Sequence, residues 1–93
     1  MSIRPAIIGN WKMNGSGNDV KLVRRFADFL DKQKIVADVM ICPPSTLIDR
    51  VGEAIKGAKI KIGAQNCHIE QSGAFTGDVS VPMLKDAGAK AVN

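Results

Sequence analysis

The sequence predicts an α/β fold in which parallel strands alternate with helices. Short apolar runs, typical of buried strands, are each followed by a segment in which apolar residues recur at the spacing of a helix. A chain of 93 residues buries only a modest core, which allows one small domain. Its 45% of apolar residues and 24% of charged residues are ordinary for a globular domain.

The first predicted unit joins a strand at residues 4–9 to a helix at residues 18–32. The strand contains the apolar run of residues 6–9, which we expect to be buried. Asp19 favours the start of the helix, because a carboxylate interacts well with the positive end of the helix dipole. The helix face that we expect to be buried carries Val20, Val23, Phe26, Ala27, Phe29 and Leu30.

The second predicted unit joins a strand at residues 36–42 to a helix at residues 46–56. Pro43 and Pro44 end the strand, because proline cannot continue a central strand. Ser45 precedes the helix and belongs to the residue types that cap helix N-termini. The apolar stripe of this helix consists of Leu47, Ile48, Val51, Ala54 and Ile55.

The third predicted unit begins with a strand at residues 60–66 and ends with a short helix. Ser80 is expected to cap this helix, and Pro82 then falls in its first turn, where proline is tolerated. Gly88 stands just past the predicted end, a position that favours glycine. Residues 89–93 would then begin a fourth strand.

Polar side chains follow the first strand, at the edge of the sheet where parallel α/β folds build their sites. Asn10 and Lys12 lie two residues apart, so on an extended backbone their side chains would point the same way. An amide and an ammonium that face one cavity would suit an anionic, oxygen-rich ligand. Taken by themselves, these residues also fit a polar turn after a strand.

Five short segments stand out along the chain. They are Gly-Asn-Trp-Lys-Met-Asn at 9–14, Cys-Pro-Pro at 42–44, Gly-Ala-Gln-Asn at 63–66, Gly-Ala-Phe-Thr-Gly-Asp-Val-Ser at 73–80 and Met-Leu-Lys-Asp-Ala-Gly at 83–88. In this order and spacing they resemble the triosephosphate isomerase family, although Asp78 stands where the family usually has glutamate. The resemblance implies a partial (β/α)8 TIM barrel with three strand–helix units and the start of a fourth strand. Residues 1–93 would form the incomplete N-terminal part of one domain of roughly 250 residues.

The resemblance also implies a reaction, the interconversion of dihydroxyacetone phosphate and D-glyceraldehyde 3-phosphate in glycolysis and gluconeogenesis, with no cofactor. In this family a carboxylate base moves a proton through an enediolate while a neutral histidine polarises the carbonyl; triosephosphate isomerase is itself the standard illustration of such tuned groups. Asn10 and Lys12 would bind the phosphorylated triose, and Lys12 would also be catalytic. The segments that carry the family's catalytic histidine and glutamate are not among these residues, so we expect the isolated chain to be inactive. The alternative is a non-catalytic folding fragment that associates with itself or complements another fragment.

The segment of residues 67–79 is long for a loop inside a compact domain, and loops of that length are usually functional or disordered. Composition alone is equally compatible with a flexible surface excursion. The resemblance implies that this loop holds a homodimer together and reaches the partner's site. The residues implied at the dimer interface are Met13, Gln65, Asn66, Thr76 and Gly77.

Several other kinds of protein are disfavoured. The net charge of +4 is dispersed along the chain and only 4% of residues are aromatic, which argues against a nucleic-acid partner. No apolar stretch suggests a signal peptide or a membrane span, so we expect a cytoplasmic protein. No metal is expected, because His68 is the single histidine; we expect it to have a structural or surface role. Cys42 and Cys67 are expected to be reduced and mostly buried.

Overall fold

The computed structural model describes residues 3–93. Its three parallel strands form one sheet in the order β1-β2-β3, and strands alternate with helices along the chain as predicted. The strands are β1 (Ala6–Asn10), β2 (Asp38–Cys42) and β3 (Lys61–Ile62). The helices are α1 (Val20–Asp31), α2 (Ile48–Ala54) and α3 (Val81–Ala87), and short 3-10 turns, η1 (Gly17–Asp19) and η2 (Ser45–Leu47), precede the first two.

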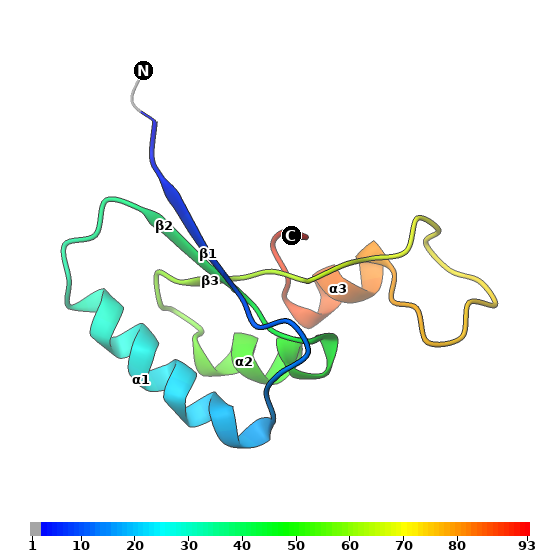
Figure 1. The fold of residues 1–93 in the computed structure, drawn as a ribbon, viewed down its shortest axis with the longest axis horizontal. Helices are drawn as coiled ribbons and strands as arrows, with labels where there is room; N and C mark the ends of the chain where they lie inside the picture. Colours follow the sequence, from blue (N-terminus) through cyan, green and yellow to red (C-terminus); the bar gives the residue numbers. More distant parts are fainter. Residues whose placement is uncertain (1–2) are drawn as a thin grey trace.

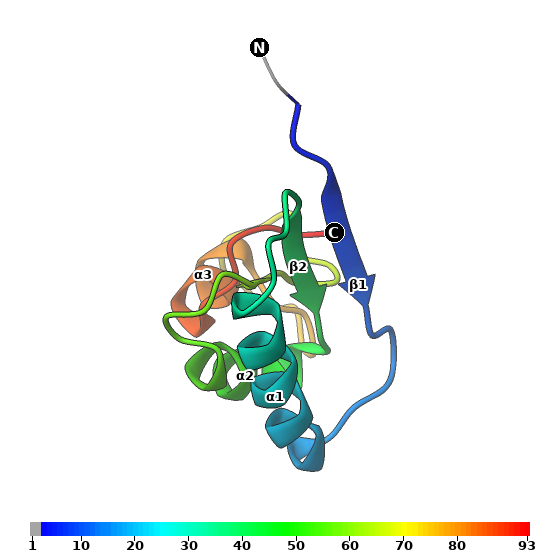
Figure 2. The same cartoon turned by 90° about the vertical axis from the view of Figure 1, so that its left-hand side faces the viewer.

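All three helices cover the same face of the sheet, with α2 between α1 and α3 (Figures 1 and 2). The core lies between this helical layer and the sheet. Its largest fully buried side chains come from the end of β2 and from the segment that enters α2: Cys42, Pro43, Leu47, Ile48 and Val51. Of the apolar stripe predicted for the second helix, Leu47, Ile48, Val51 and Ile55 are confirmed as core residues, whereas Ala54 is only partly buried.

β1 is an edge strand that pairs only with β2, residue for residue from Ala6 opposite Asp38 to Asn10 opposite Cys42. Every residue of β1 is exposed, so the expectation of a buried first strand was wrong. The reason is that side chains alternate between the two faces of a strand, and neither face of β1 is covered well by the helices. Ile7 is 59% exposed.

The predicted third strand is regular over only two residues, but the chain beyond it pairs with the C-terminal residues. Ala64 and Val92 form an isolated parallel bridge. The Ala64 N–H donates to the carbonyl of Ala91, and the Asn93 N–H donates to the carbonyl of Ala64, both at 2.8 Å. The start of a fourth parallel strand is thus confirmed at residues 89–93, beside β3.

α1 buries a narrower stripe than predicted. Val23 and Ala27, four residues apart, are buried against the core, whereas Phe26 and Phe29 are 43% and 59% exposed. Successive residues of a helix are rotated by about 100°, so Phe29 projects far from the line through Val23 and Ala27. The expectation that both phenylalanines are buried was wrong, because the described elements cover these two side chains only in part.

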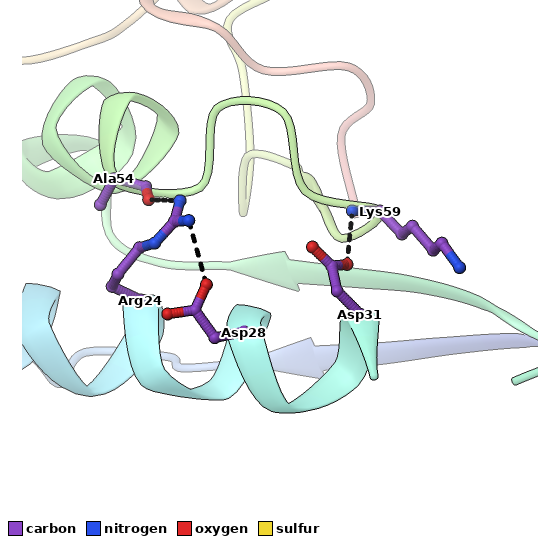
Figure 3. A network of polar contacts seen from close by, with 5 residues as sticks. All are labelled: Arg24, Asp28, Asp31, Ala54 and Lys59. Carbon is purple, nitrogen blue, oxygen red and sulfur yellow. Dashed lines mark hydrogen bonds and ion pairs between the residues drawn. The ribbon is translucent and has the colours of Figure 1, made fainter. Parts of the chain in front are cut away.

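Polar contacts connect the exposed flank of α1 to the segment that links α2 with β3 (Figure 3). The guanidinium of Arg24 donates to the carbonyl of Ala54 at 2.7 Å, which satisfies a carbonyl left free at the end of α2. Arg24 also pairs with Asp28 at 3.0 Å, and Asp31 accepts a hydrogen bond from the Lys59 N–H at 3.1 Å. These contacts set the position of α1 relative to α2 more than they add stability, because the charged groups are about half exposed.

The two predicted serine caps differ. Ser80 caps α3 as predicted: its hydroxyl accepts a hydrogen bond from the Met83 N–H at 3.4 Å. Gly88 ends the same helix with a φ of 114°, the left-handed conformation that favours glycine. Ser45 was expected to cap α2 but instead begins η2, and its side chain makes no capping hydrogen bond. Pro44 occupies the position before η2, and Leu47 occupies the position before α2.

This difference predicts unequal costs of removing the two hydroxyls. Ser80→Ala should lower the free energy of unfolding by about 1 kcal/mol, since an N-cap contributes about 0.5–2 kcal/mol. Ser45→Ala is the matched control and should change it by less than about 0.5 kcal/mol. Urea unfolding followed by circular dichroism measures both, and equal losses would contradict the assignment of the caps.

Candidate functional site

The candidate site lies where the carboxyl ends of the three parallel strands meet. The segments that follow β1, β2 and β3 surround an open hollow of about 460 Å³. Its lining consists of Asn10, Lys12, Met13, Pro44, Ser45, Gln65 and Asn66. The structure therefore brings together five residues that the sequence analysis proposed, and it adds Pro44 and Ser45. The position of Ser45 shortly after a parallel strand could have indicated that it lines the hollow.

Lys12 has a left-handed backbone, with a φ of 58°, and it is the only non-glycine residue with positive φ among those described. The prediction that Asn10 and Lys12 share an extended backbone was therefore wrong. The side-chain oxygen of Asn10 instead accepts a hydrogen bond from the Lys12 N–H at 2.7 Å, which turns the chain sharply after β1. Both residues still line the hollow, but a turn places them there.

A left-handed backbone at a non-glycine residue costs about 1–3 kcal/mol and persists only where the surroundings hold it. At Lys12 both backbone polar groups are held by side chains. Asn10 binds the N–H, and the side-chain amide of Gln65 donates to the carbonyl at 2.8 Å. The next turn is closed by Asn14, whose amide donates to the carbonyl of Trp11 at 2.9 Å.

The lining of the hollow combines one cation with several neutral polar groups. Lys12 supplies the single charged side chain of the lining, and the other polar groups are three amides and one hydroxyl. Within residues 3–93, no carboxylate or imidazole lines this hollow. A cation surrounded by neutral hydrogen-bonding groups suits an anionic, oxygen-rich ligand.

Two of the proposed interface residues lie away from the hollow. Thr76 and Gly77 form a turn within the 67–79 loop, which projects from the rest of the chain (yellow and orange in Figure 1). The Asp78 N–H donates to the carbonyl of Phe75 at 3.1 Å, and Gly77 has a φ of 88°. A type II turn requires this positive φ at its third position, which explains the glycine.

His68 lies at the base of this loop and does not reach the hollow. Its backbone N–H donates to the carbonyl of Val79 at 2.8 Å, and the bridge between His68 and Ser80 closes the loop. Its ring stacks on Phe75 with 4.1 Å between centroids, while its Nδ1 accepts a hydrogen bond from the Glu70 N–H. These contacts agree with the structural role expected for this histidine.

The two cysteines are both free thiols, but they occupy different environments. Cys42 is buried, and its burial raises the pKa of the thiol, an effect partly opposed by a hydrogen bond with the backbone of Gly63. Cys67 is exposed, so the expectation of two mostly buried thiols was wrong for this residue. It stands at the start of the projecting loop, most of whose residues are exposed.

The contrast predicts selective alkylation. At pH 8, iodoacetamide should modify Cys67 at least on the order of tenfold faster than Cys42, because the thiolate is the reactive form and burial disfavours it. Because the pKa of Cys42 is raised on folding, the neutral thiol also stabilises the fold, and this contribution is lost as pH rises through the folded pKa. Peptide mass spectrometry over time measures both rates; equal rates in the folded protein would contradict the burial of Cys42.

Two other features of the described residues bear on the class of protein. In residues 3–93 no three side chains of histidine, cysteine, aspartate or glutamate come together as a metal site would require. None of the helices in the same part of the chain is long and apolar enough to cross a membrane.

The parallel sheet, the single helical layer and the hollow at the carboxyl ends of the strands define a segment of a (β/α)8 barrel. The family model described as triosephosphate isomerase matches residues 5–93. The chain belongs to the triosephosphate isomerase family.

Known relatives agree with this assignment. Triosephosphate isomerase of Bradyrhizobium diazoefficiens is 43% identical over 95 residues, which cover 98% of this chain and 36% of the relative. The triosephosphate isomerase of Caulobacter vibrioides is 46% identical over 89 residues, which cover 96% of this chain and 35% of the relative. The crystal structure of triosephosphate isomerase from Bartonella henselae superposes with a TM-score of 0.89 at 43% identity, over 97% of this chain and 37% of that one. The chain thus spans little more than a third of the length of these relatives.

Proposed function

We propose that residues 1–93 form the N-terminal part of a single barrel domain of a triosephosphate isomerase, and that this segment supplies the cation that binds the substrate. The reaction would interconvert dihydroxyacetone phosphate and D-glyceraldehyde 3-phosphate, in the cytoplasmic pathways of glycolysis and gluconeogenesis. The observation that carries the proposal is the left-handed Lys12, held by hydrogen bonds beside a hollow that is otherwise neutral.

Lys12 would act on the charges of the substrate. Its ammonium would bind the phosphate and stabilise the oxyanion that develops in the enediolate, and a fixed charge acts more strongly in a site that excludes water. Asn10 uses its side-chain oxygen within the chain, so its amide hydrogens are left for the ligand. Lys12 would therefore supply the positive charge, and Asn10 would orient the substrate through its amide hydrogens.

The proton transfer itself would be carried out by residues outside this segment. Among the described residues, the lining of the hollow includes neither a carboxylate nor an imidazole, and His68 lies where the 67–79 loop begins. We therefore expect that residues 1–93 contribute to binding and orienting the substrate but cannot isomerise it alone.

We also propose that the projecting loop joins two subunits. Met13, in the lining of the hollow, is 96% exposed, which is unusual for a large apolar side chain, and Thr76 and Gly77 are exposed in a turn of the loop. A loop from a second subunit that covered Met13 would bury both surfaces. It would also complete one wall of the site, which would make dimerisation part of catalysis.

A hybrid barrel tests the proposal: residues 1–93 replace the matching 37% of the Bartonella henselae enzyme. We expect the hybrid to isomerise glyceraldehyde 3-phosphate and to elute as a dimer on gel filtration, whereas the 93-residue chain alone shows no activity. A hybrid that is folded by circular dichroism yet inactive would overturn the proposed function. A folded, active monomer would overturn the role of the loop.

The exposed edge of β1 favours a second candidate, a non-catalytic fragment that associates with itself or with a complementary fragment. An unpaired strand edge is a template for another chain, and Ile7 and Ile8 add exposed apolar surface to this one. Sedimentation of the 93-residue chain at several concentrations tests this candidate. A monomer at all concentrations that gains no activity with the remainder of the barrel would exclude it.

A further inference from the structure

Gln65 connects the ends of all three strands through one side-chain amide. The residue follows β3, and its Nε2 donates to two carbonyls: that of Lys12, after β1, at 2.8 Å, and that of Cys42, the last residue of β2, at 3.0 Å. The Trp11 N–H donates to the same Cys42 carbonyl at 3.1 Å. These hydrogen bonds therefore connect the turn that carries Lys12 to the end of β2 and to the segment that follows β3.

These contacts use both hydrogens of the Gln65 amide. A primary amide has two N–H donors, and each of them is committed to a carbonyl of the same chain. The oxygen is the one polar atom of this side chain that remains for a ligand or a second subunit. Gln65 is half-buried, which fits a side chain directed into its own chain rather than toward a partner.

The Lys12 backbone depends on such contacts. Its left-handed φ of 58° is one that non-glycine residues rarely adopt, and its N–H is already held by Asn10. Without Gln65 the Lys12 carbonyl would lose its side-chain partner, and the residue could relax toward a more favourable backbone conformation. Any such relaxation moves the ammonium at the end of the side chain.

We infer that Gln65 is a positioning residue: it holds Lys12 in the left-handed conformation that presents its ammonium to the hollow. This inference rests on the proposed function, because Lys12 is the group through which it acts. Gln65 itself acts through backbone carbonyls and would contact no reacting atom.

A double-mutant cycle in the hybrid barrel tests the inference. Gln65→Met removes both donors and keeps the length of the side chain, and Gln33→Met is the matched control on an exposed glutamine after α1. We expect Gln65→Met to lower kcat/KM about 10- to 100-fold and to weaken competitive inhibition by inorganic phosphate. Gln33→Met should leave both unchanged. In a Lys12→Met background, Gln65→Met should have almost no further effect, because the two residues act as one unit.

The outcomes separate this inference from the function on which it rests. The positioning role is wrong if Gln65→Met lowers kcat/KM by the same factor in the unsubstituted hybrid and in the Lys12→Met background. It is also wrong if Gln65→Met leaves kcat/KM and the inhibition by phosphate unchanged. If the unsubstituted hybrid is folded but inactive, or Lys12→Met is fully active, the proposed function fails instead. Should Gln65→Met not fold, Gln65→Glu keeps the shape and replaces the donors by a carboxylate that repels both carbonyls. Kinetics equal to those of the unsubstituted hybrid would then overturn the inference.

Discussion

Lys12→Met is expected to lower kcat/KM of the hybrid barrel for glyceraldehyde 3-phosphate by about 100- to 1000-fold, the effect of removing one preorganised charge-stabilising group. Methionine keeps most of the side chain and removes the ammonium, so the hollow loses its single charge. Both kcat and KM should change, because the cation would bind the phosphate before reaction and the oxyanion during it. Steady-state kinetics in both directions measure the effect.

The control for this prediction is Lys61→Met. Lys61 is exposed at the start of β3, whereas the hollow lies beyond the other ends of the strands. This variant should retain kcat/KM within about twofold, and both variants should have the same circular dichroism spectrum. An active Lys12→Met enzyme, or an equal loss in the control, would show that the positive charge of the hollow has no specific role.

Ile48→Ala is expected to have the largest effect on stability. Ile48 is completely buried where η2 passes into α2, in the centre of the core. Removing its side chain leaves a cavity and should lower the free energy of unfolding by about 2–5 kcal/mol. Whole domains are stable by only about 5–15 kcal/mol, so this loss is a large fraction of the total. Urea unfolding of the hybrid barrel measures it.

The matched control is the same change at an exposed position. Ile3 is 91% exposed before β1, and Ile3→Ala should alter the free energy of unfolding by no more than about 0.5 kcal/mol. A small loss at Ile48 would mean that the core does not pack around α2. A large loss at Ile3 would mean that another element of the full barrel covers it.

Local sequence patterns predicted the elements that have a strong periodicity or a clear cap. The stripe through Leu47, Ile48 and Val51 identified the helix at the centre of the core, because its spacing is that of one helix face. Ser80 and Gly88 marked both ends of α3, because capping depends on residues that are neighbours in sequence. The parallel arrangement followed from the alternation of strands and helices.

Predictions of burial failed where they depended on distant parts of the chain. Phe26 and Phe29 belong to the apolar pattern of α1, yet they are 43% and 59% exposed because the described part of the chain covers them only in part. The apolar run of β1 is exposed for the same reason. Burial is a property of the neighbours that the fold supplies, and periodicity shows only which residues could be buried together.

At the candidate site, too, the sequence predicted some features and only the tertiary structure revealed others. The sequence by itself determined that Asn10, Lys12 and Met13 follow a parallel strand, and hence the edge of the sheet at which they lie. Only the tertiary structure decided how Lys12 is held. Its left-handed backbone depends on a hydrogen bond from Gln65, 53 residues further along the chain. Local propensity disfavours that conformation at lysine, and a contact so distant in sequence forms only when β1, β2 and β3 lie side by side.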